Sequence, residues 1–281
     1  MVKNILSEAS GPCSLRTLQS KASSQRIAFL TSYDGTDFVG FQWQNNGRSV
    51  QAVLEKALLS LYKENIRVSG CSRTDAGVHA SAHVSHADVP FFIPEDKIAL
   101  AMNSHLPDDI AVLDAIFTDD DFHARFDACG KRYVYRIWNH PIRPVLQKRF
   151  QAHIPAKLDV SEMKKAAESF VGEHDFSAFC AAGGQQVSPI RYIEDVQVEK
   201  SGPEIRIVVR GKSFLYNMVR IMAGTLVYVG MGKFDAKAIG DALSWKDRRF
   251  AGKTMPAHGL TLEQVFYEKI SFPLQERKEK A

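Results

Sequence analysis

Hydrophobic and polar positions alternate along this chain with two different periods, which predict strands and helices in turn. In the first half, short apolar runs bounded by turn residues predict strands at 26–33, 66–72, 82–89, 110–117 and 132–139. Apolar residues recur at the spacing of one helical face over 49–62, and Ser49 suits the N-cap of that helix. Residues 94–105 predict a shorter helix, with Pro94 near its start.

The second half of the chain repeats this mixture. Helical periods cover 160–171, 216–229 and 236–245, and residues 172–189 predict a loop. Strands at 190–199 and 204–212 predict a hairpin, and 260–269 predicts a last strand. Hairpins with interspersed helices favour an α+β fold with an antiparallel or mixed sheet over a doubly wound fold.

Pro141 and Pro144 mark the best boundary between two mixed α/β halves, at 26–140 and 141–270. Residues 1–25 are rich in Ser and Lys and lack the apolar core, about 7–15 residues long, of a signal peptide. We expect them to form a disordered extension and residues 271–281 to form a charged tail. No apolar run approaches the roughly 20 residues that span a membrane, so the expected location is the cytoplasm.

Composition and cysteine usage narrow the class of protein. The chain has 281 residues, of which 45% are hydrophobic and 24% charged, as in soluble globular proteins. Its net charge of +4 is too small to indicate a nucleic-acid partner by itself. No two of its four cysteines (Cys13, Cys71, Cys129 and Cys180) form a CxxC pair, so zinc and redox motifs lack support and free thiols are expected.

The segment Arg73–His79 carries the most distinctive chemistry of the chain. It places Asp75 two residues after Arg73 on a glycine-containing loop at the end of a predicted strand. An arginine this close can keep an aspartate ionised and hold an anionic ligand beside it. The segment is therefore typical of a carboxylate nucleophile presented to a phosphate-bearing substrate.

A metal site, a hydrolase site and a phosphate-binding loop have weaker support in the sequence. His79, His83 and His86 lie near Asp75, but alternation along a strand directs His83 and His86 to opposite faces, which disfavours a metal site. A hydrolase would need a second acid roughly 5–10 Å away. Asp88 and the run 119–121 could supply one, although that run is typical of a solvated loop. The glycine pair at 183–184 has no lysine placed as in a P-loop.

Two further features stay open on pattern alone. Residues 131–138 mix basic and aromatic side chains, with Lys131, Tyr133 and Tyr135 on one face of a strand. Such a face suits stacking on a nucleobase, worth roughly 1–3 kcal/mol, or an ordinary amphipathic strand. Arg220 interrupts an apolar helix face, where it either meets solvent or pairs with an anion such as Asp75.

Several separated segments, taken together and in order, resemble the tRNA pseudouridine synthase A family. The matching segments are 33–42, 48–51, 72–79, 121–126, 131–135, 214–220 with Gly224, and Pro256 with Gly259-Leu260. The resemblance covers about Arg26 to Tyr267. It departs at Ser72, where the family usually has glycine before the motif arginine.

The resemblance implies an isomerase with the pseudouridine synthase fold and a catalytic cleft between two halves that share a largely antiparallel sheet. It implies conversion of uridine to pseudouridine at positions 38, 39 and 40 of the tRNA anticodon stem-loop, with no cofactor and no metal. It also implies a homodimer whose tRNA crosses both subunits. A non-catalytic RNA-binding protein on the same scaffold is the alternative, and a carboxylate hydrolase is a third hypothesis.

Residue roles follow from the same resemblance. Asp75 matches the nucleophile and Arg220 the partner that forms an ion pair with it. Tyr133 matches the tyrosine that stacks on the extruded uracil, Arg73 takes part in base extrusion and Leu260 packs on the base. His79 and Arg132 are further expected substrate-binding residues.

Overall fold

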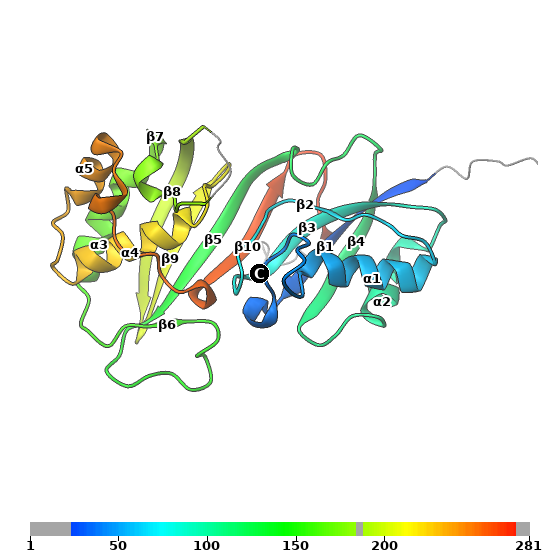
Figure 1. Ribbon diagram of the computed structural model, residues 1–281, viewed down its shortest axis with the longest axis horizontal. Coiled ribbons are helices and arrows are strands. Elements are labelled where there is room, and N and C mark those ends of the chain that lie inside the picture. The colour runs from blue at the N-terminus through cyan, green and yellow to red at the C-terminus, as the bar shows by residue number, and fades with distance from the viewer. Residues whose placement is uncertain (1–23, 184–187, 274–281) are drawn as a thin grey trace, which may run out of the picture.

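The computed structural model describes residues 24–183 and 188–273, and one mixed β-sheet runs through its centre (Figure 1). Within these residues the strand order is β4-β1-β3-β10-β5-β9-β8-β7, with β2 paired to β3 and β6 to β5. The strands are β1 (Gln25–Tyr33), β2 (Ser69–Gly70), β3 (His79–Val89), β4 (Ile110–Thr118), β5 (Ala128–Trp138), β6 (Ala152–His153), β7 (Gly172–Asp175), β8 (Ile190–Ser201), β9 (Glu204–Gly211) and β10 (Leu260–Tyr267).

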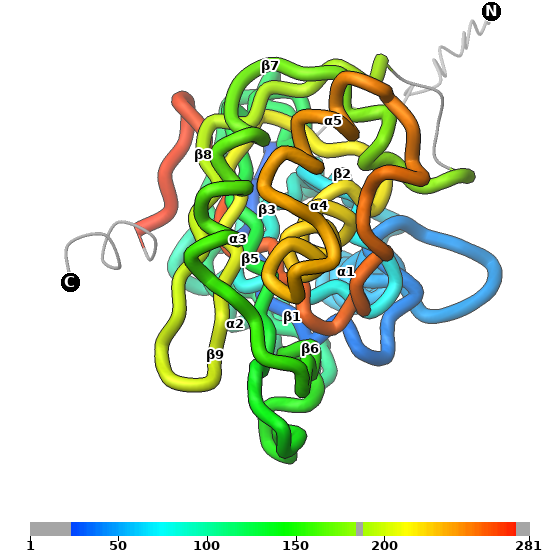
Figure 2. The backbone as a smooth tube through the Cα atoms, turned by 90° about the vertical axis from the view of Figure 1, so that its left-hand side faces the viewer, coloured from blue at the N-terminus to red at the C-terminus, as the bar shows by residue number. Residues whose placement is uncertain are grey.

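Five α-helices within the described residues flank this sheet in two groups. Helices α1 (Val50–Tyr62) and α2 (Glu95–Asn103) accompany the strands of the first half, and α3 (Val160–Ala167), α4 (Met218–Gly230) and α5 (Ala238–Trp245) accompany those of the second (Figure 1). Figure 2 shows α3, α4 and α5 close together, with α3 next to β8. Buried side chains from both halves form one continuous hydrophobic core.

Most strand pairs are antiparallel, and the two parallel pairs are β3 with β10 and β5 with β6. The expected α+β class with a largely antiparallel central sheet is therefore confirmed. Local signals located most elements well. Helix α1 begins after Ser49, whose hydroxyl accepts a hydrogen bond from the Ala52 amide at 3.3 Å. The predicted hairpin turns at Gly202, which has a φ of +55°.

Two predicted elements were wrong in part. The strand expected at 66–72 shrinks to Ser69–Gly70, because side chains of α1 take the backbone groups of Val68: its amide donates to Glu55 and its carbonyl accepts from Gln51. The loop expected at 172–189 contains strand β7, which pairs with β8. Phe176 and Phe179 follow β7 and are buried, so packing orders a segment that has no local strand signal.

The last strand returns to the centre of the sheet. Strand β10 lies between β3 and β5, parallel to the first and antiparallel to the second. The division into halves at 26–140 and 141–270 remains a proposal. Strand β10 belongs to the second half in sequence, but it pairs with β3 and β5 of the first half. The predicted extension at 1–25 and tail at 271–281 lie mostly outside the described residues. Within those residues no helix is long and apolar enough to cross a membrane.

Candidate active site

The loop that carries Asp75 connects β2 to β3 and is fastened to a neighbouring loop by backbone hydrogen bonds. The Phe41 amide donates to the Thr74 carbonyl at 3.1 Å, and the Gly77 amide donates to Phe38 at 3.2 Å. Gly40 makes this approach possible: its φ is +111°, and a Cβ there would stand 2.7 Å from the Thr74 oxygen. The carboxylate is thus held on a stiff loop rather than on a free tip.

Asp75 faces Arg220, which lies 145 residues further along the chain at the first turn of α4. Arg220 Nη1 is 3.5 Å from Asp75 Oδ2, and the side chains are 17% and 20% exposed. Burial raises the pKa of Asp75, and the positive charge of Arg220 opposes that rise. The two side chains lie at the long end of hydrogen-bond distance, and the carboxylate is partly removed from solvent.

Backbone and side-chain acceptors hold the guanidinium of Arg220 in place. Its Nε donates to the Met255 carbonyl at 2.7 Å, and Nη1 donates to Asn217 Oδ1 at 2.5 Å. Asn217 has a φ of +57°, a conformation that asparagine tolerates better than most residues. The segment that supplies Met255 reaches α4 because Gly224 has no side chain: a Cβ there would stand 1.9 Å from the Lys253 oxygen.

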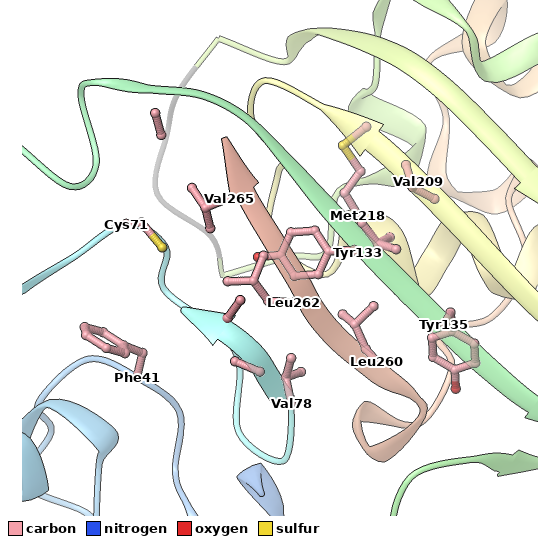
Figure 3. Close-up of a cluster of buried hydrophobic side chains, with 14 of the residues drawn as sticks. Phe41, Cys71, Val78, Tyr133, Tyr135, Val209, Met218, Leu260, Leu262 and Val265 are labelled. Carbon is pink, nitrogen blue, oxygen red and sulfur yellow. The ribbon is translucent and has the colours of Figure 1, made fainter. Parts of the chain in front are cut away.

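Tyr133 forms the apolar wall of the site. Its ring is 7% exposed, meets Phe214 edge to face at 5.2 Å between centroids, and lies opposite Leu262 on β10. Figure 3 shows this ring between Leu262 and Met218, with Leu260 one step along β10. The Tyr133 hydroxyl lies 3.0 Å from Ser72 Oγ, next to the loop that carries Asp75.

A family model described as tRNA pseudouridine synthase matches residues 30–127 and 166–268, which is more than half of the chain. Proteins named tRNA pseudouridine synthase A are similar over most of its length. The one from Ruminiclostridium cellulolyticum is 47% identical over 86% of this chain and 100% of its own, and the one from Brevibacillus brevis is 45% identical with the same coverage. A third, from Halalkalibacterium halodurans, is 44% identical over 84% of this chain and 90% of its own.

The chain belongs to the tRNA pseudouridine synthase family. This membership confirms the expected family, the pseudouridine synthase fold and the enzyme class, an isomerase.

Two of the residues that we expected to bind substrate, Arg132 and His79, have partners within the protein. Arg132 directly precedes Tyr133, so the pleat of β5 turns it to the opposite sheet face, where its Nε lies 3.0 Å from Glu263 Oε2. His79 is 2% exposed. Its Nδ1 accepts from the Gly35 amide at 3.0 Å and its Nε2 donates to the Arg149 carbonyl at 2.8 Å. These bonds connect His79, which follows the Asp75 loop, to two neighbouring loops.

Two more of the expected residues are Leu260 on β10 and Arg73 on the Asp75 loop. Leu260 is buried on β10 opposite Tyr135, so Leu262 rather than Leu260 lies directly across from Tyr133. Arg73 is exposed on the same loop as Asp75 and has no hydrogen bond or ion pair to the described part of the chain.

The structure also bears on the metal and hydrolase hypotheses. His83 and His86 are buried rather than superficial, and they bond to different loops: His83 to the Ser72 carbonyl and His86 to the Ala124 amide. Across 24–183 and 188–273, no group of His, Cys, Asp or Glu side chains could hold a metal ion. The charge that acts on the Asp75 carboxylate is the positive charge of Arg220, whereas a hydrolase would place a second acid there.

Sequence reasoning missed several members of the site. The contact between Ser72 and Tyr133, the carbonyl of Met255 and the amide oxygen of Asn217 have no sequence signal that would single them out. Leu262 could have been found, because residues two apart on a strand share a face and Leu260 was already a candidate. The free thiols expected at Cys71, Cys129 and Cys180 are present, and Cys13 lies outside the described residues.

Proposed function

We propose that this protein converts uridine to pseudouridine at positions 38, 39 and 40 of the tRNA anticodon stem-loop, with Asp75 as nucleophile. The observation that supports this most directly is the Asp75–Arg220 pair, whose carboxylate is near enough to act as a charge on the buried Tyr133 hydroxyl. A carboxylate that is partly removed from water and only loosely bonded to its arginine can act as a nucleophile. An aromatic side chain next to it can stack on a flipped base.

The proposed reaction needs no second reactant. The bond from uracil N1 to ribose C1′ breaks, the base turns, and C5 bonds to C1′ while the C5 proton leaves and N1 gains one. Asp75 serves as an anion whether it attacks C1′, attacks C6, or removes the C2′ proton to give a glycal. Arg220 favours that anion, because its positive charge opposes the rise in the pKa of Asp75 caused by burial.

The surrounding residues fit the handling of an extruded base. Stacking on Tyr133 would offset part of the few kcal/mol that flipping costs. Burial raises the pKa of Tyr133, so its hydroxyl stays protonated and available to Ser72 or to the base. Arg73, exposed on the loop, would enter the space that the base leaves, and Leu260 would pack against the uracil.

Tritium release from tRNA that carries 5-tritiated uridine tests the proposal. Wild type should release label in the presence of a chelator. Asp75→Asn should bind tRNA at matched salt and release none, whereas Asp96→Asn, an exposed carboxylate on α2, should behave as wild type. Substantial release by Asp75→Asn would refute the nucleophile. Binding without release by wild type would favour the non-catalytic alternative, and dependence on metal would favour a hydrolase.

The target sites and the assembly follow as parts of the proposal. Pseudouridine mapping in tRNA from cells that lack this protein should show loss at positions 38, 39 and 40, and loss elsewhere only would refute that assignment. We also propose a cytoplasmic homodimer whose tRNA crosses both subunits. Light scattering after size exclusion should give twice the 31.4 kDa chain mass at micromolar concentration.

A further inference from the structure

Lys131 is a largely buried lysine that has no ion pair within the described residues. It lies on β5, two residues before Tyr133 and on the same face of the sheet, and is only 9% exposed. Its neighbours across the strands are Val265 on β10 and Gly211 on β9, neither of which carries a charge. Within the described residues its ammonium has no ion pair and no hydrogen bond.

The groups that act electrostatically on Lys131 do not supply a counter-charge. They are the Cys71 thiol, the His83 imidazole and the Arg125 guanidinium. Burial raises the pKa of Cys71 to about 11 and lowers that of His83 to about 4, so both are neutral at pH 7. Arg125 is itself a cation, and within the described part of the chain it too has no ion pair.

An arrangement of this kind disfavours folding. Burial lowers the pKa of Lys131, which means that the charged form is less stable here than in water. Buried charges in proteins are normally paired, and an unpaired one costs stability that a neutral side chain of the same shape would not. Residues that cost stability in this way are typical of ligand sites, where the ligand supplies the missing partner.

We propose that Lys131 and Arg125 bind one backbone phosphate of the RNA, next to the nucleotide whose base stacks on Tyr133. The inference rests on the proposed function, which supplies a polyanionic substrate at this cleft. A phosphate would give both cations an anionic partner. Its position beside the base would fix the register of the RNA strand in the cleft. Phe126, 74% exposed, lies with its ring 5.8 Å from the Arg125 guanidinium carbon.

The test uses synthetic anticodon stem-loops in which one phosphate at a time is replaced by a neutral methylphosphonate. Wild type should bind one such RNA about 10- to 100-fold more weakly than the parent, the range expected for a hydrogen bond between charged groups. Lys131→Met should bind the parent RNA about that much more weakly and should not distinguish that methylphosphonate from the parent. Lys131→Arg should retain most of the affinity, and Lys97→Met on α2 should match wild type.

Two more readouts separate ligand binding from a structural role. Lys131→Met should lessen the salt dependence of binding by about one phosphate contact, and it should raise the Tm by about 2–4 °C because it removes an unpaired buried charge. Wild-type affinity and salt dependence in Lys131→Met would overturn the proposal. A lower Tm would do so as well, since it would show that the ammonium supports the fold.

The same variant keeps this inference distinct from the proposed function. If wild type releases tritium, Lys131→Met should raise KM more than it lowers kcat, because a phosphate contact acts on binding. If wild type releases none, the proposed reaction fails, but the methylphosphonate comparison still decides whether Lys131 binds a phosphate. A sensitivity to methylphosphonates that is equal in wild type and Lys131→Met at every position would refute the subsite.

Discussion

The hydrogen bond between Ser72 and Tyr133 connects the Asp75 loop to the aromatic wall of the site, and its contribution to stability can be measured. The two hydroxyls are 3.0 Å apart, and the tyrosine is 7% exposed. A hydrogen bond between neutral groups contributes about 1 kcal/mol, and a buried hydroxyl left without a partner costs about 1–3 kcal/mol. Ser72→Ala should therefore lower the free energy of unfolding by about 1–2 kcal/mol.

A double-mutant cycle isolates this bond. Tyr133→Phe removes the other hydroxyl, so Ser72→Ala should cost little in that background, and the coupling energy should be about 1 kcal/mol. Ser72→Gly, which restores the usual family residue, should cost roughly 0.5–1 kcal/mol more than Ser72→Ala because glycine frees the unfolded backbone. Urea unfolding at pH 7, followed by circular dichroism, gives each free energy.

The same double-mutant cycle can be measured by enzyme activity. If the bond holds the Tyr133 ring where the uracil stacks, Ser72→Ala should lower kcat/KM for tritium release about fivefold, which corresponds to about 1 kcal/mol. A coupling energy below about 0.3 kcal/mol in both assays would refute the reasoning, since independent sites add within that margin. The serine would then be a neutral replacement for glycine.

Two further predictions concern pH. Arg220→Met removes the charge that opposes the rise in the pKa of Asp75, so the acidic limb of kcat/KM should move to higher pH, and a move to lower pH would contradict the ion pair. Burial lowers the pKa of His83 from 6.5 to about 4. As the pH falls, His83 is therefore protonated in the unfolded chain before it is protonated in the folded one, which favours unfolding. Wild type should lose about 2 kcal/mol of stability through His83 between pH 7.5 and 5, as measured by urea unfolding, and His83→Gln should be spared that loss. Equal losses in the two proteins would show that His83 titrates normally.

Local sequence signals were sufficient for much of the fold. Helix α1 is encoded by the spacing of its apolar residues and by Ser49, and the β8–β9 hairpin by the turn at 201–203. Strand β7 was missed because its order comes from pairing with β8 and from the burial of Phe176, which is a tertiary effect. Nothing local in 260–267 shows that this strand lies in the middle of the sheet.

The candidate site shows the same limit more sharply. Asp75 stands out by its neighbours in sequence, but Arg220 is 145 residues away, and pattern alone left it either solvent-facing or paired. The family resemblance supplied that pairing as an expectation. Adjacency in sequence does not place Arg132 beside the Tyr133 ring, because successive residues on a strand point to opposite faces. Whether Arg132 contacts substrate stays a prediction.

The position of β10 bears on how a newly made chain becomes an enzyme. A ribosome releases the chain from its N-terminus, and domains generally fold as units while synthesis proceeds. In the sheet of the described residues, β10 connects β4, β1 and β3 to β5, β9 and β8, so we expect these two groups of strands to join once residues 260–267 have emerged. The wall opposite Tyr133 is therefore the last part of the site to form. A nascent or C-terminally truncated chain contains Asp75 and Tyr133 but lacks the strand that lies between β3 and β5. We therefore expect activity only after the whole chain has been synthesised.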